Sequence, residues 1–352
     1  MSIKVKEVVK QFDGFTALSG VSLNIKEGEL VALLGPSGSG KTTLLRIIAG
    51  LDFPTAGKIK MDGIDASSKH VGARNVGFVF QHYALFRHMT VFENVAFGLR
   101  VKPRRIRPAE GEIRERVMRL LKLVQLEGFA SRYPSQLSGG QRQRVALARA
   151  LAARPEVVIA DEITSALDVS VQGAVLNLIR RIRRELGLSL LFISHNLAVV
   201  RYVSDVIAVM YLGRLVEVGP TEAVLADPQH PYTRSLLESA PRLGSRLMGS
   251  PLLGGRPAGA ADDSELDVDI ADPHDPPTGC RFHPRCPVGP RVLPLRGICV
   301  DVDPTVDAAA RPHRAACHFP GATTTGQPIT GQPISGPTTT PGAGPDTEEV
   351  SA

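Results

Sequence analysis

One glycine-rich stretch carries the residue types that bind a triphosphate. It consists of Gly35, Pro36, Ser37, Gly38, Ser39, Gly40, Lys41, Thr42 and Thr43. Glycines let successive backbone N–H groups turn inward around a phosphate, where side chains would clash. The spacing is that of a phosphate-binding loop (P-loop), in which Lys41 reaches the β- and γ-phosphates and the Thr42 hydroxyl ligates Mg²⁺. A strand-like run, 29–34, precedes the stretch and a helix-like run, 44–49, follows it, so the sequence predicts binding of a nucleoside triphosphate with Mg²⁺.

Two adjacent carboxylates supply candidate hydrolytic chemistry. Asp161 and Glu162 end an apolar, strand-like run at 157–160. Asp161 can hold Mg²⁺, usually through water, whereas Glu162 points to the other face and can polarise an attacking water. Acidic pairs after strands are common, so this pair takes its meaning from the P-loop. Together the two motifs predict hydrolysis of the triphosphate.

A third motif stands at the start of a helical pattern and reads Leu137-Ser138-Gly139-Gly140-Gln141. Ser138 and Gln141 have the spacing of a capping box, which would begin the helix. The two glycines keep backbone N–H groups accessible and so make a second anion site. With this motif in place the sequence resembles the ATP-binding-cassette (ABC) ATPases, whose signature motif it matches.

The resemblance covers residues 1 to about 240 and implies functions for further residues. Phe12 matches the aromatic residue that stacks on adenine, and Gln81 matches the glutamine that senses Mg²⁺, water and the permease. Asp168 belongs to the matching D-loop, and His195 matches the histidine that contacts the γ-phosphate. The implied catalytic residues are Glu162, His195, Gln81 and Lys41. The implied Mg²⁺ ligands are Thr42, Gln81 and Asp161.

The resemblance also implies an architecture and a set of partners. The expected fold is α/β, a P-loop NTPase of ABC type with a RecA-like core, a β-subdomain and an inserted helical subdomain at about 84–152. In this family two subunits hold two ATP molecules head to tail, so the P-loop of one faces the signature motif of the other. The implied partners are a second ABC ATPase, as homodimer or heterodimer, two integral-membrane permease subunits and, indirectly, a solute-binding protein. The implied reaction is ATP hydrolysis coupled to transport, by in-line attack of water on the γ-phosphate.

The resemblance divides between two subfamilies of importer ATPases. Residues 1 to about 150 are similar to those of sulfate/thiosulfate importers, most clearly at 80–99. From about 155 to 320 the chain is similar to oligopeptide/dipeptide importer ATPases. The matching segments there are 160–172, 230–237 and 279–287. The chain is therefore either a recombinant joined within 137–152 or a natural branch of one subfamily.

The resemblance leads to one expected function with an alternative solute. The chain is expected to be the ATPase subunit of an ABC importer. Sulfate or thiosulfate is favoured as the solute, because the groove that receives the permease belongs to the first half of the chain. Oligopeptide or dipeptide import is the alternative, because the C-terminal half matches that subfamily.

The apolar pattern along the chain agrees with this architecture. Residues 1 to about 240 alternate strand and helix signals, as α/β domains do. Strands are predicted at 4–8, 30–34, 76–80, 157–160, 190–193 and 206–210. Between residues 80 and 157 the spacing becomes helical, at 90–99, 112–126 and 138–152. We therefore predict one nucleotide-binding domain at 1–240 that contains a helical insertion.

The rest of the chain divides into three parts by composition. Residues 241–278 are rich in Gly, Pro, Ala and Asp and are predicted to form a linker. Residues 279–320 form a small Cys-containing extension. Residues 321–352 form a low-complexity tail, which is predicted to be disordered because it cannot bury enough apolar surface.

All four cysteines of the chain fall in the small extension, at Cys280, Cys286, Cys299 and Cys317. Their spacing is too open for the hairpins of common zinc ribbons. Four thiolates in a cytosolic protein suit a [4Fe–4S] cluster, and the resemblance to peptide-importer ATPases implies one at this place. Zinc, held with help from His283 or His318, and four unligated thiols are the alternatives.

Bulk composition argues against other classes of partner. The formal net charge is +6, but the basic residues cluster at 100–107 and 180–184, which resemble solvated helix faces or ends. Aromatic residues are 5% with no tryptophan, so base-stacking platforms are scarce and nucleic acid is not expected. No apolar run reaches the ~18 residues that span a bilayer, and the N-terminus has no signal-peptide core. The protein is expected at the cytoplasmic face of the inner or plasma membrane, as a peripheral subunit.

Two other classes of function compete with an importer subunit. A soluble cassette ATPase that acts on DNA or ribosomes usually carries two cassettes or an inserted module, whereas this sequence has one P-loop and one signature motif. A binding-only regulatory protein would not need both Glu162 and His195.

Overall fold

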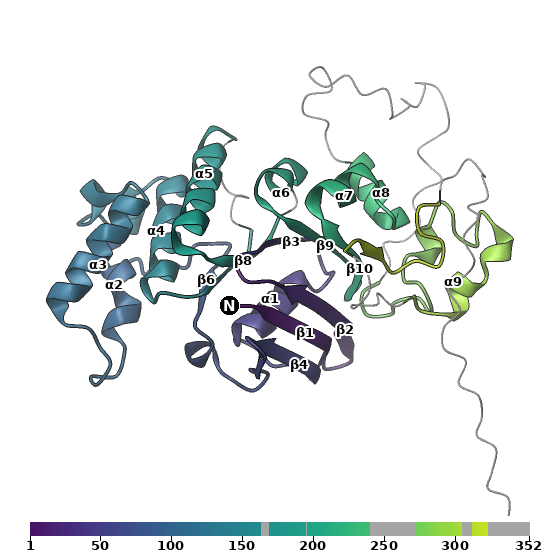
Figure 1. The fold of residues 1–352 in the computed structure, drawn as a ribbon, viewed down its shortest axis with the longest axis horizontal. Coiled ribbons are helices and arrows are strands. Elements are labelled where there is room, and N and C mark those ends of the chain that lie inside the picture. The colour runs from purple at the N-terminus through teal and green to yellow at the C-terminus, as the bar shows by residue number, and fades with distance from the viewer. Residues whose placement is uncertain (163–168, 195, 240–271, 305–311, 323–352) are drawn as a thin grey trace, which may run out of the picture.

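The structure is a computed structural model that describes residues 1–162, 169–194, 196–239, 272–304 and 312–322 (Figure 1). Asp168 and His195 of the predicted site lie outside the described residues. So do residues 241–271 of the predicted linker and residues 323–352 of the predicted disordered tail. No helix in the described part of the chain is long and apolar enough to cross a bilayer.

A central sheet organises the described residues, with seven strands in the order β11-β10-β9-β3-β8-β7-β6. The strands are β3 (Leu30–Leu34), β6 (Val76–Val79), β7 (Val157–Ala160), β8 (Ser189–Ile193), β9 (Val206–Tyr211), β10 (Arg214–Pro220) and β11 (Arg314–Ala315). The strands from β9 to β6 pair in parallel, whereas β10 pairs antiparallel with β9 and β11. Because the carboxyl ends of parallel strands meet at one edge, the segments that follow β3, β6, β7 and β8 come together there.

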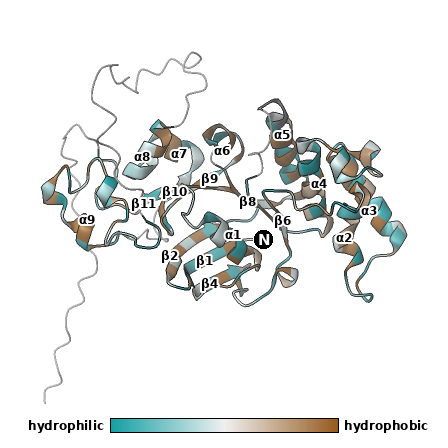
Figure 2. Ribbon diagram, turned by 180° about the vertical axis from the view of Figure 1, so that it is seen from behind, coloured by the Kyte–Doolittle hydropathy of each residue, from teal (hydrophilic) through white to brown (hydrophobic). Residues whose placement is uncertain are grey.

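A smaller antiparallel sheet lies beside the central one, with four strands among the described residues in the order β2-β1-β4-β5. Its strands are β1 (Ile3–Phe12), β2 (Phe15–Ile25), β4 (Ala56–Met61) and β5 (Ile64–Asp65). Figure 2 shows polar and apolar residues intermixed along β1, β2 and β4, the pattern of a sheet that buries one face. This sheet corresponds to the expected β-subdomain.

Helix α1 (Lys41–Ala49) lies between the two sheets. Its buried Leu44, Leu45 and Ile47 share one hydrophobic core with side chains of the small sheet and with Val31 and Leu33 of β3. The alternate residues of β3 belong to a second core, on the other face of the sheet, together with buried residues of the helices within 91–152 and 175–203. The P-loop therefore joins a strand buried on both faces to a helix buried between two sheets.

The inserted helices are α2 (Val91–Arg100), α3 (Glu110–Leu123) and α4 (Gly139–Ala152). The predictions at 90–99 and 138–152 agree with α2 and α4 within one residue. Helix α3 was predicted at 112–126, so it begins two residues earlier and ends three residues earlier than expected. Figure 1 shows these helices at one end of the molecule, beyond β6.

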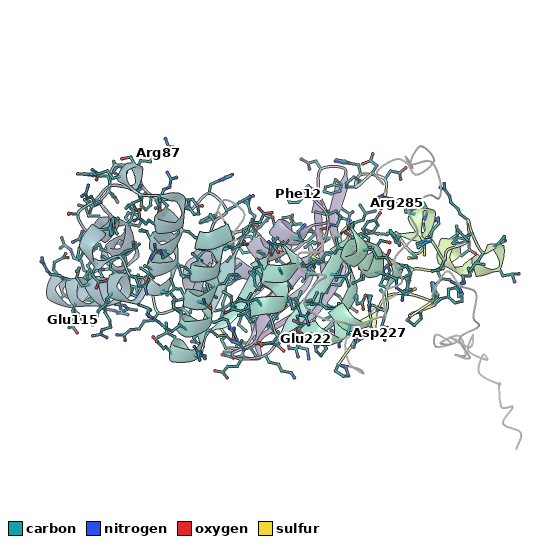
Figure 3. All side chains as sticks on the ribbon, turned by 90° about the horizontal axis from the view of Figure 1, so that it is seen from above. Phe12, Arg87, Glu115, Glu222, Asp227 and Arg285 are labelled. Atoms are coloured by element: carbon teal, nitrogen blue, oxygen red, sulfur yellow. The ribbon has the colours of Figure 1, made fainter. Side chains whose placement is uncertain are left out.

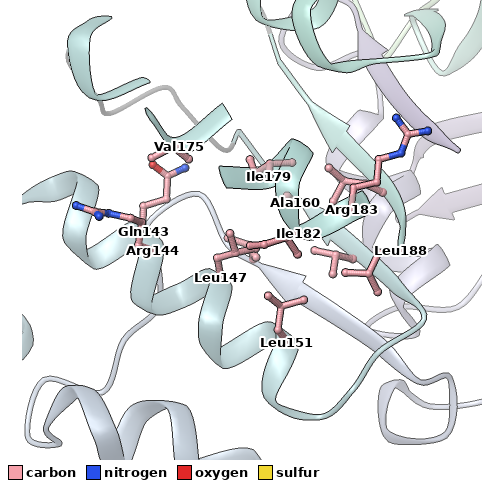
Figure 4. Close-up of a pocket in the computed structure, with 13 residues that line it drawn as sticks. Gln143, Arg144, Leu147, Leu151, Ala160, Val175, Ile179, Ile182, Arg183 and Leu188 are labelled. Carbon is pink, nitrogen blue, oxygen red and sulfur yellow. The ribbon is translucent and has the colours of Figure 1, made fainter. Parts of the chain in front are cut away.

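A small apolar cavity of about 30 Å³ separates α4 from α5 (Val169–Leu186). Figure 4 shows Leu147, Leu151, Ile179 and Ile182 around it. Apolar side chains make up most of the lining, which also includes Gln143, Arg144 and Arg183, and the volume is far too small for a nucleotide or a drug-sized ligand. It is a packing gap rather than a candidate site.

The C-terminal elements return to the central sheet. Helices α6 (Leu197–Val203), α7 (Thr221–Ala226) and α8 (Pro231–Glu238) precede the predicted linker, and the short α9 (Ile298–Asp301) follows it. Strand β11 then pairs with β10, and Phe282 packs edge-on against Tyr211 and Tyr232, with ring centroids 5.4 Å apart in both pairs. The Cys-containing extension is therefore packed against the nucleotide-binding domain (Figure 1).

The predicted strands are confirmed, but the prediction was incomplete. The ranges 30–34 and 157–160 coincide with β3 and β7, whereas β1 continues to Phe12, four residues beyond its predicted end. Strands β2, β4 and β10 were not predicted. The first two belong to the small antiparallel sheet, where bulges interrupt the pairing and weaken the alternation of polar and apolar residues.

Candidate site for nucleotide binding and hydrolysis

The P-loop curls tightly against two neighbouring segments, and two of its glycines are required for that. Gly35 has φ 143°, and a Cβ there would lie 2.2 Å from the Met210 carbonyl oxygen. Gly40 has φ 91° and caps the N-terminus of α1, where a Cβ would lie 2.6 Å from the Ala17 carbonyl oxygen. Any side chain at either position would clash with backbone. The loop thus presents the N-terminal end of α1, which favours anions.

Lys41 places its ammonium group over the loop. Its Nζ donates to the carbonyl oxygens of Gly35, at 2.9 Å, and Pro36, at 2.6 Å. Burial lowers the pKa of Lys41, while the nearby charges of Glu162 and Asp161 raise it. The geometry suits a cation that exchanges carbonyl oxygens for phosphate oxygens.

Three oxygen-bearing side chains fit a Mg²⁺ site. The Thr42 hydroxyl donates to Asp161 Oδ2 at 3.3 Å. Burial raises the pKa of Asp161, against the opposing effects of the Thr42 hydrogen bond and the Lys41 charge. Gln81, two residues after β6, also carries an amide oxygen, and its amide nitrogen bonds Glu162, the neighbour of Asp161. Mg²⁺ prefers such hard oxygen ligands and keeps several waters and phosphate oxygens, so one carboxylate is sufficient.

Glu162 lies within reach of the same group. Gln81 Nε2 donates to Glu162 Oε2 at 2.7 Å, although the two residues come from different loops at the sheet edge. Glu162 has φ 51°, a left-handed conformation that costs a non-glycine residue about 1–2 kcal/mol. Strained backbone is concentrated at functional sites. Here the carboxylate of Asp161 meets Thr42, whereas that of Glu162 meets Gln81.

Phe12 ends β1 at the tip of the hairpin with β2 (Figure 3). Its side chain is 47% exposed, so one ring face is available for a nucleobase. Lys10 Nζ lies 4.9 Å from the ring centroid, and Phe15 is the partner of Phe12 across the hairpin.

The predicted signature motif forms the expected helix start. The Ser138 hydroxyl accepts from the Gln141 backbone N–H at 3.3 Å, and Gln141 Oε1 accepts from the Ser138 N–H at 2.8 Å. These bonds make the predicted capping box at the N-terminus of α4. In the described part of the chain no hydrogen bond or ion pair joins residues 138–141 to the P-loop. One subunit therefore brings together Lys41, Thr42, Gln81, Asp161 and Glu162, but not the signature motif.

Arg149 is a site residue that the sequence analysis missed. Its guanidinium group, from α4, donates to the carbonyl oxygens of Ala84, at 2.6 Å, and Tyr83, at 2.9 Å. Both acceptor residues have positive φ, 46° and 61°, and burial lowers the pKa of Arg149. The contact links the segment after Gln81 to the helix that the signature motif begins. An arginine within the apolar pattern of a helix was the only signal for it.

The four cysteines line one pocket, together with Phe282 and His230. Burial raises the pKa of the thiols of Cys280 and Cys286 to about 11 and of Cys317 to about 12. Among the described residues no three His, Cys, Asp or Glu side chains are placed to share one metal ion. The structure therefore gives no support to bound zinc or to the [4Fe–4S] expectation. His283 and His318 direct ring nitrogens to the carbonyl oxygens of Cys280 and Val302.

Comparisons with known proteins agree with this geometry. The family described as "ABC transporter" matches residues 18–165. The family described as "Oligopeptide/dipeptide transporter, C-terminal region" matches residues 216–290. Both resemblances inferred from the sequence are thereby confirmed.

Curated relatives match most of the chain. The sulfate/thiosulfate import ATP-binding protein CysA of Ralstonia nicotianae is 50% identical over 286 residues, which cover 78% of this chain and 77% of that protein. The sulfate/thiosulfate import ATP-binding protein CysA 2 of Shewanella oneidensis is 54% identical over 237 residues, which cover 67% of this chain and 67% of that protein.

Solved structures share the fold. The ATP-binding cassette MJ0796, in a dimeric post-hydrolysis state bound to ADP and Pi, is 38% identical with a TM-score of 0.56. The alignment covers 62% of this chain and 98% of that one. The protein cbiO1 of Clostridium perfringens, part of the transporter complex cbiONQ, is 33% identical with a TM-score of 0.59, over 64% and 90% of the two chains. The fold, the assembled P-loop and carboxylates and these relatives agree: the chain belongs to the ABC transporter family, as an ATPase that couples ATP hydrolysis to transport.

Proposed function

We propose that this chain is the ATPase subunit of a sulfate/thiosulfate importer. The assignment of the solute rests on the sequence identity of 50–54% to relatives that are named for sulfate/thiosulfate import. Those matches cover 67–78% of the chain.

The proposed mechanism uses the residues that meet at the carboxyl edge of the sheet. The P-loop and the N-terminal end of α1 hold the β- and γ-phosphates, and Lys41 neutralises their charge. Mg²⁺, held by Thr42, Asp161 and Gln81, would supply charge neutralisation on the phosphate oxygens. Glu162 accepts a hydrogen bond from the attacking water and orients it in line with the γ-phosphate.

The proposed active unit is a dimer. Within the residues that the structure describes, no hydrogen bond or ion pair joins Ser138, Gly139, Gly140 and Gln141 to the P-loop. The N–H groups of Ser138 and Gln141 are used in the capping box. We therefore assign the N-terminal end of α4, with the N–H groups of Gly139 and Gly140, to the γ-phosphate held by a second subunit. Asp168 and His195, whose roles rest on the sequence resemblance, would complete each site. A copy of this chain and a related ATPase would both supply the same contacts as the second subunit.

The proposed partners are two integral-membrane permease subunits at the cytoplasmic face, with a solute-binding protein acting through them. Arg149 supports this coupling, because it joins the segment after Gln81 to the signature helix. Displacement of residues 83–86 by a permease helix would thus be transmitted through Arg149 to the helix that carries the signature motif. Import of oligopeptides or dipeptides is the second candidate, favoured by the match of residues 216–290 to the C-terminal region of those transporters.

Partner choice gives a direct test of the solute. We expect this chain to copurify as an ATPase-active complex with a sulfate-type permease pair, because the helical insertion and the segment after Gln81 lie in the sulfate-like half. A peptide-type permease pair, expressed in the same way, serves as the matched comparison. Assembly with the peptide-type pair alone would show that the C-terminal half determines the choice of permease, and would reverse the assignment of the solute.

We retain the [4Fe–4S] cluster as a proposal for the Cys-containing extension, supported by the convergence of all four thiols on one pocket. Cys280, Cys286, Cys299 and Cys317 would hold it, and it would clamp the extension without entering the ATPase reaction. We expect protein purified without oxygen to contain about four iron atoms and four labile sulfides per chain, and to show visible absorbance that bleaches on reduction. Cys317→Ser should lose that absorbance. Four titratable free thiols in iron-free, folded protein would show that the cluster is absent.

A further inference from the structure

Residues 272–275, the first described residues of the predicted linker, form a tight turn with its own hydrogen bonds. The His274 backbone N–H donates to Asp272 Oδ1 at 2.8 Å, and the Asp275 N–H donates to the Asp272 carbonyl oxygen at 3.2 Å. Local side-chain-to-backbone bonds of this kind fix a turn without help from a sheet or helix. The position of the turn, however, is set by what it contacts.

The turn lies against two parts of the nucleotide site. Pro273 Cγ is 3.6 Å from the point that a Cβ on Gly38, in the P-loop, would occupy. The His274 ring lies 4.6 Å from the ring of Phe15, centroid to centroid, with 41° between the planes. Phe15 is the hairpin partner of Phe12, the candidate adenine-stacking residue. The turn therefore spans from the phosphate-binding loop to the aromatic hairpin.

The Cys-containing extension holds the turn there. Arg281, six residues after Asp275, donates to the Leu212 carbonyl oxygen and, at 2.8 Å, to the Ser19 hydroxyl. Arg214 forms an ion pair with Asp303. These contacts attach the extension to β2 and to the loop between β9 and β10, the segments on which the P-loop rests. The neighbouring extension thus anchors the turn beside the P-loop, which lies more than 200 residues away in the sequence.

We propose that the turn 272–275 forms a wall of the nucleotide site and binds the nucleoside part of ATP. Proline and imidazole offer apolar and planar surfaces, which suit ribose and adenine. The exposed carboxylates of Asp272 and Asp275 make the turn unsuitable for contact with phosphates, because like charges repel. This inference rests on the nucleotide site proposed above and adds His274 and Pro273 to its binding residues.

The test compares two ligands on the full-length chain. With Mg²⁺ present, calorimetry measures the Kd of a non-hydrolysable ATP analogue and of inorganic tripolyphosphate, which fills the P-loop without a nucleoside. We expect His274→Ala to raise the Kd of the ATP analogue about three- to tenfold, the loss of one aromatic contact, and to leave the Kd of tripolyphosphate unchanged. His70→Ala is the matched control, because His70 is also exposed and lies edge-on to a phenylalanine, Phe53, with centroids 5.0 Å apart. It should bind both ligands as the unaltered chain does.

The outcomes separate this inference from the proposed function. An unchanged Kd for the ATP analogue in His274→Ala would show that the turn makes no contact with the nucleoside. Tighter binding would show that it obstructs the site, and equal weakening for tripolyphosphate would show a structural role; each result overturns the proposal. Failure of the unaltered chain to bind ATP, or full binding by Lys41→Ala, would instead overturn the nucleotide site itself.

Discussion

Replacing Glu162 by glutamine lowers ATP turnover of the assembled subunit by about two orders of magnitude or more, while ATP binding is retained. The amide has the shape of the carboxylate and keeps an oxygen that can accept from Gln81, 2.7 Å away in the unaltered chain. It cannot polarise or deprotonate the attacking water, so the γ-phosphate persists. In the proposed dimer intact ATP holds the two subunits together, so the variant should accumulate as an ATP-bound dimer. Phosphate release and light scattering in the presence of ATP measure the two effects.

The control for this variant is Glu156→Gln, at the opposite end of the same strand. Glu156 is exposed, precedes β7, and accepts from the Asn75 side chain at 3.1 Å. Its replacement should leave turnover within about twofold of the unaltered chain, since surface substitutions of this kind have small effects. Full turnover by Glu162→Gln would remove Glu162 from the mechanism and with it the assignment of this edge of the sheet as the hydrolytic site.

Replacing Glu217 by alanine destabilises the folded protein by about 3–5 kcal/mol. Glu217 is fully buried in β10. Its carboxylate accepts from the backbone N–H groups of Gln229, at 2.8 Å, and His230, at 2.9 Å, and contacts His313 Nε2 at 2.7 Å. Its removal leaves these donors buried without partners, which costs more than the hydrogen bonds contributed. The free energy of unfolding, from denaturant titration, measures the loss.

The matched control is Glu222→Ala, five residues away. Glu222 pairs with Arg201 at 3.1 Å, but their side chains are 70% and 63% exposed, so the pair is screened by solvent and contributes less than about 1 kcal/mol. Because His313 precedes β11, loss of Glu217 should also weaken the attachment of the Cys-containing extension, seen as faster proteolysis after residue 239. Equal stability of the two variants would show that the buried carboxylate is not the anchor.

The sequence predicted best the features that depend on neighbouring residues. The P-loop glycines, the strand that ends in Asp161 and the capping box of Ser138 with Gln141 each require only a few consecutive positions. Backbone conformation and hydrogen bonding over such distances follow from residue type, so these elements appear where they were expected. The inserted helices were predictable for a similar reason, because their apolar residues repeat at helical spacing.

The small antiparallel sheet was less predictable. Strand β4 begins with three exposed residues, and β1 and β2 pair with bulges. Their strand conformation is decided by pairing across the sheet, and the residues of a single strand do not show that pairing.

By itself the sequence determined the local elements that hold the candidate residues: Lys41 and Thr42 at the start of a helix after a glycine-rich turn, Asp161 and Glu162 after a strand, and Ser138 to Gln141 at a helix start. Only the tertiary structure decided which of them meet. The order of the parallel strands brings Gln81 to Glu162, and the packing of the extension on β10 brings the turn 272–275 to Gly38 and Phe15. The physical reason is that contacts between distant segments form only when the whole core closes. The hydrophobic effect that closes the core is not directional, so it leaves no local sequence pattern at the residues that come together.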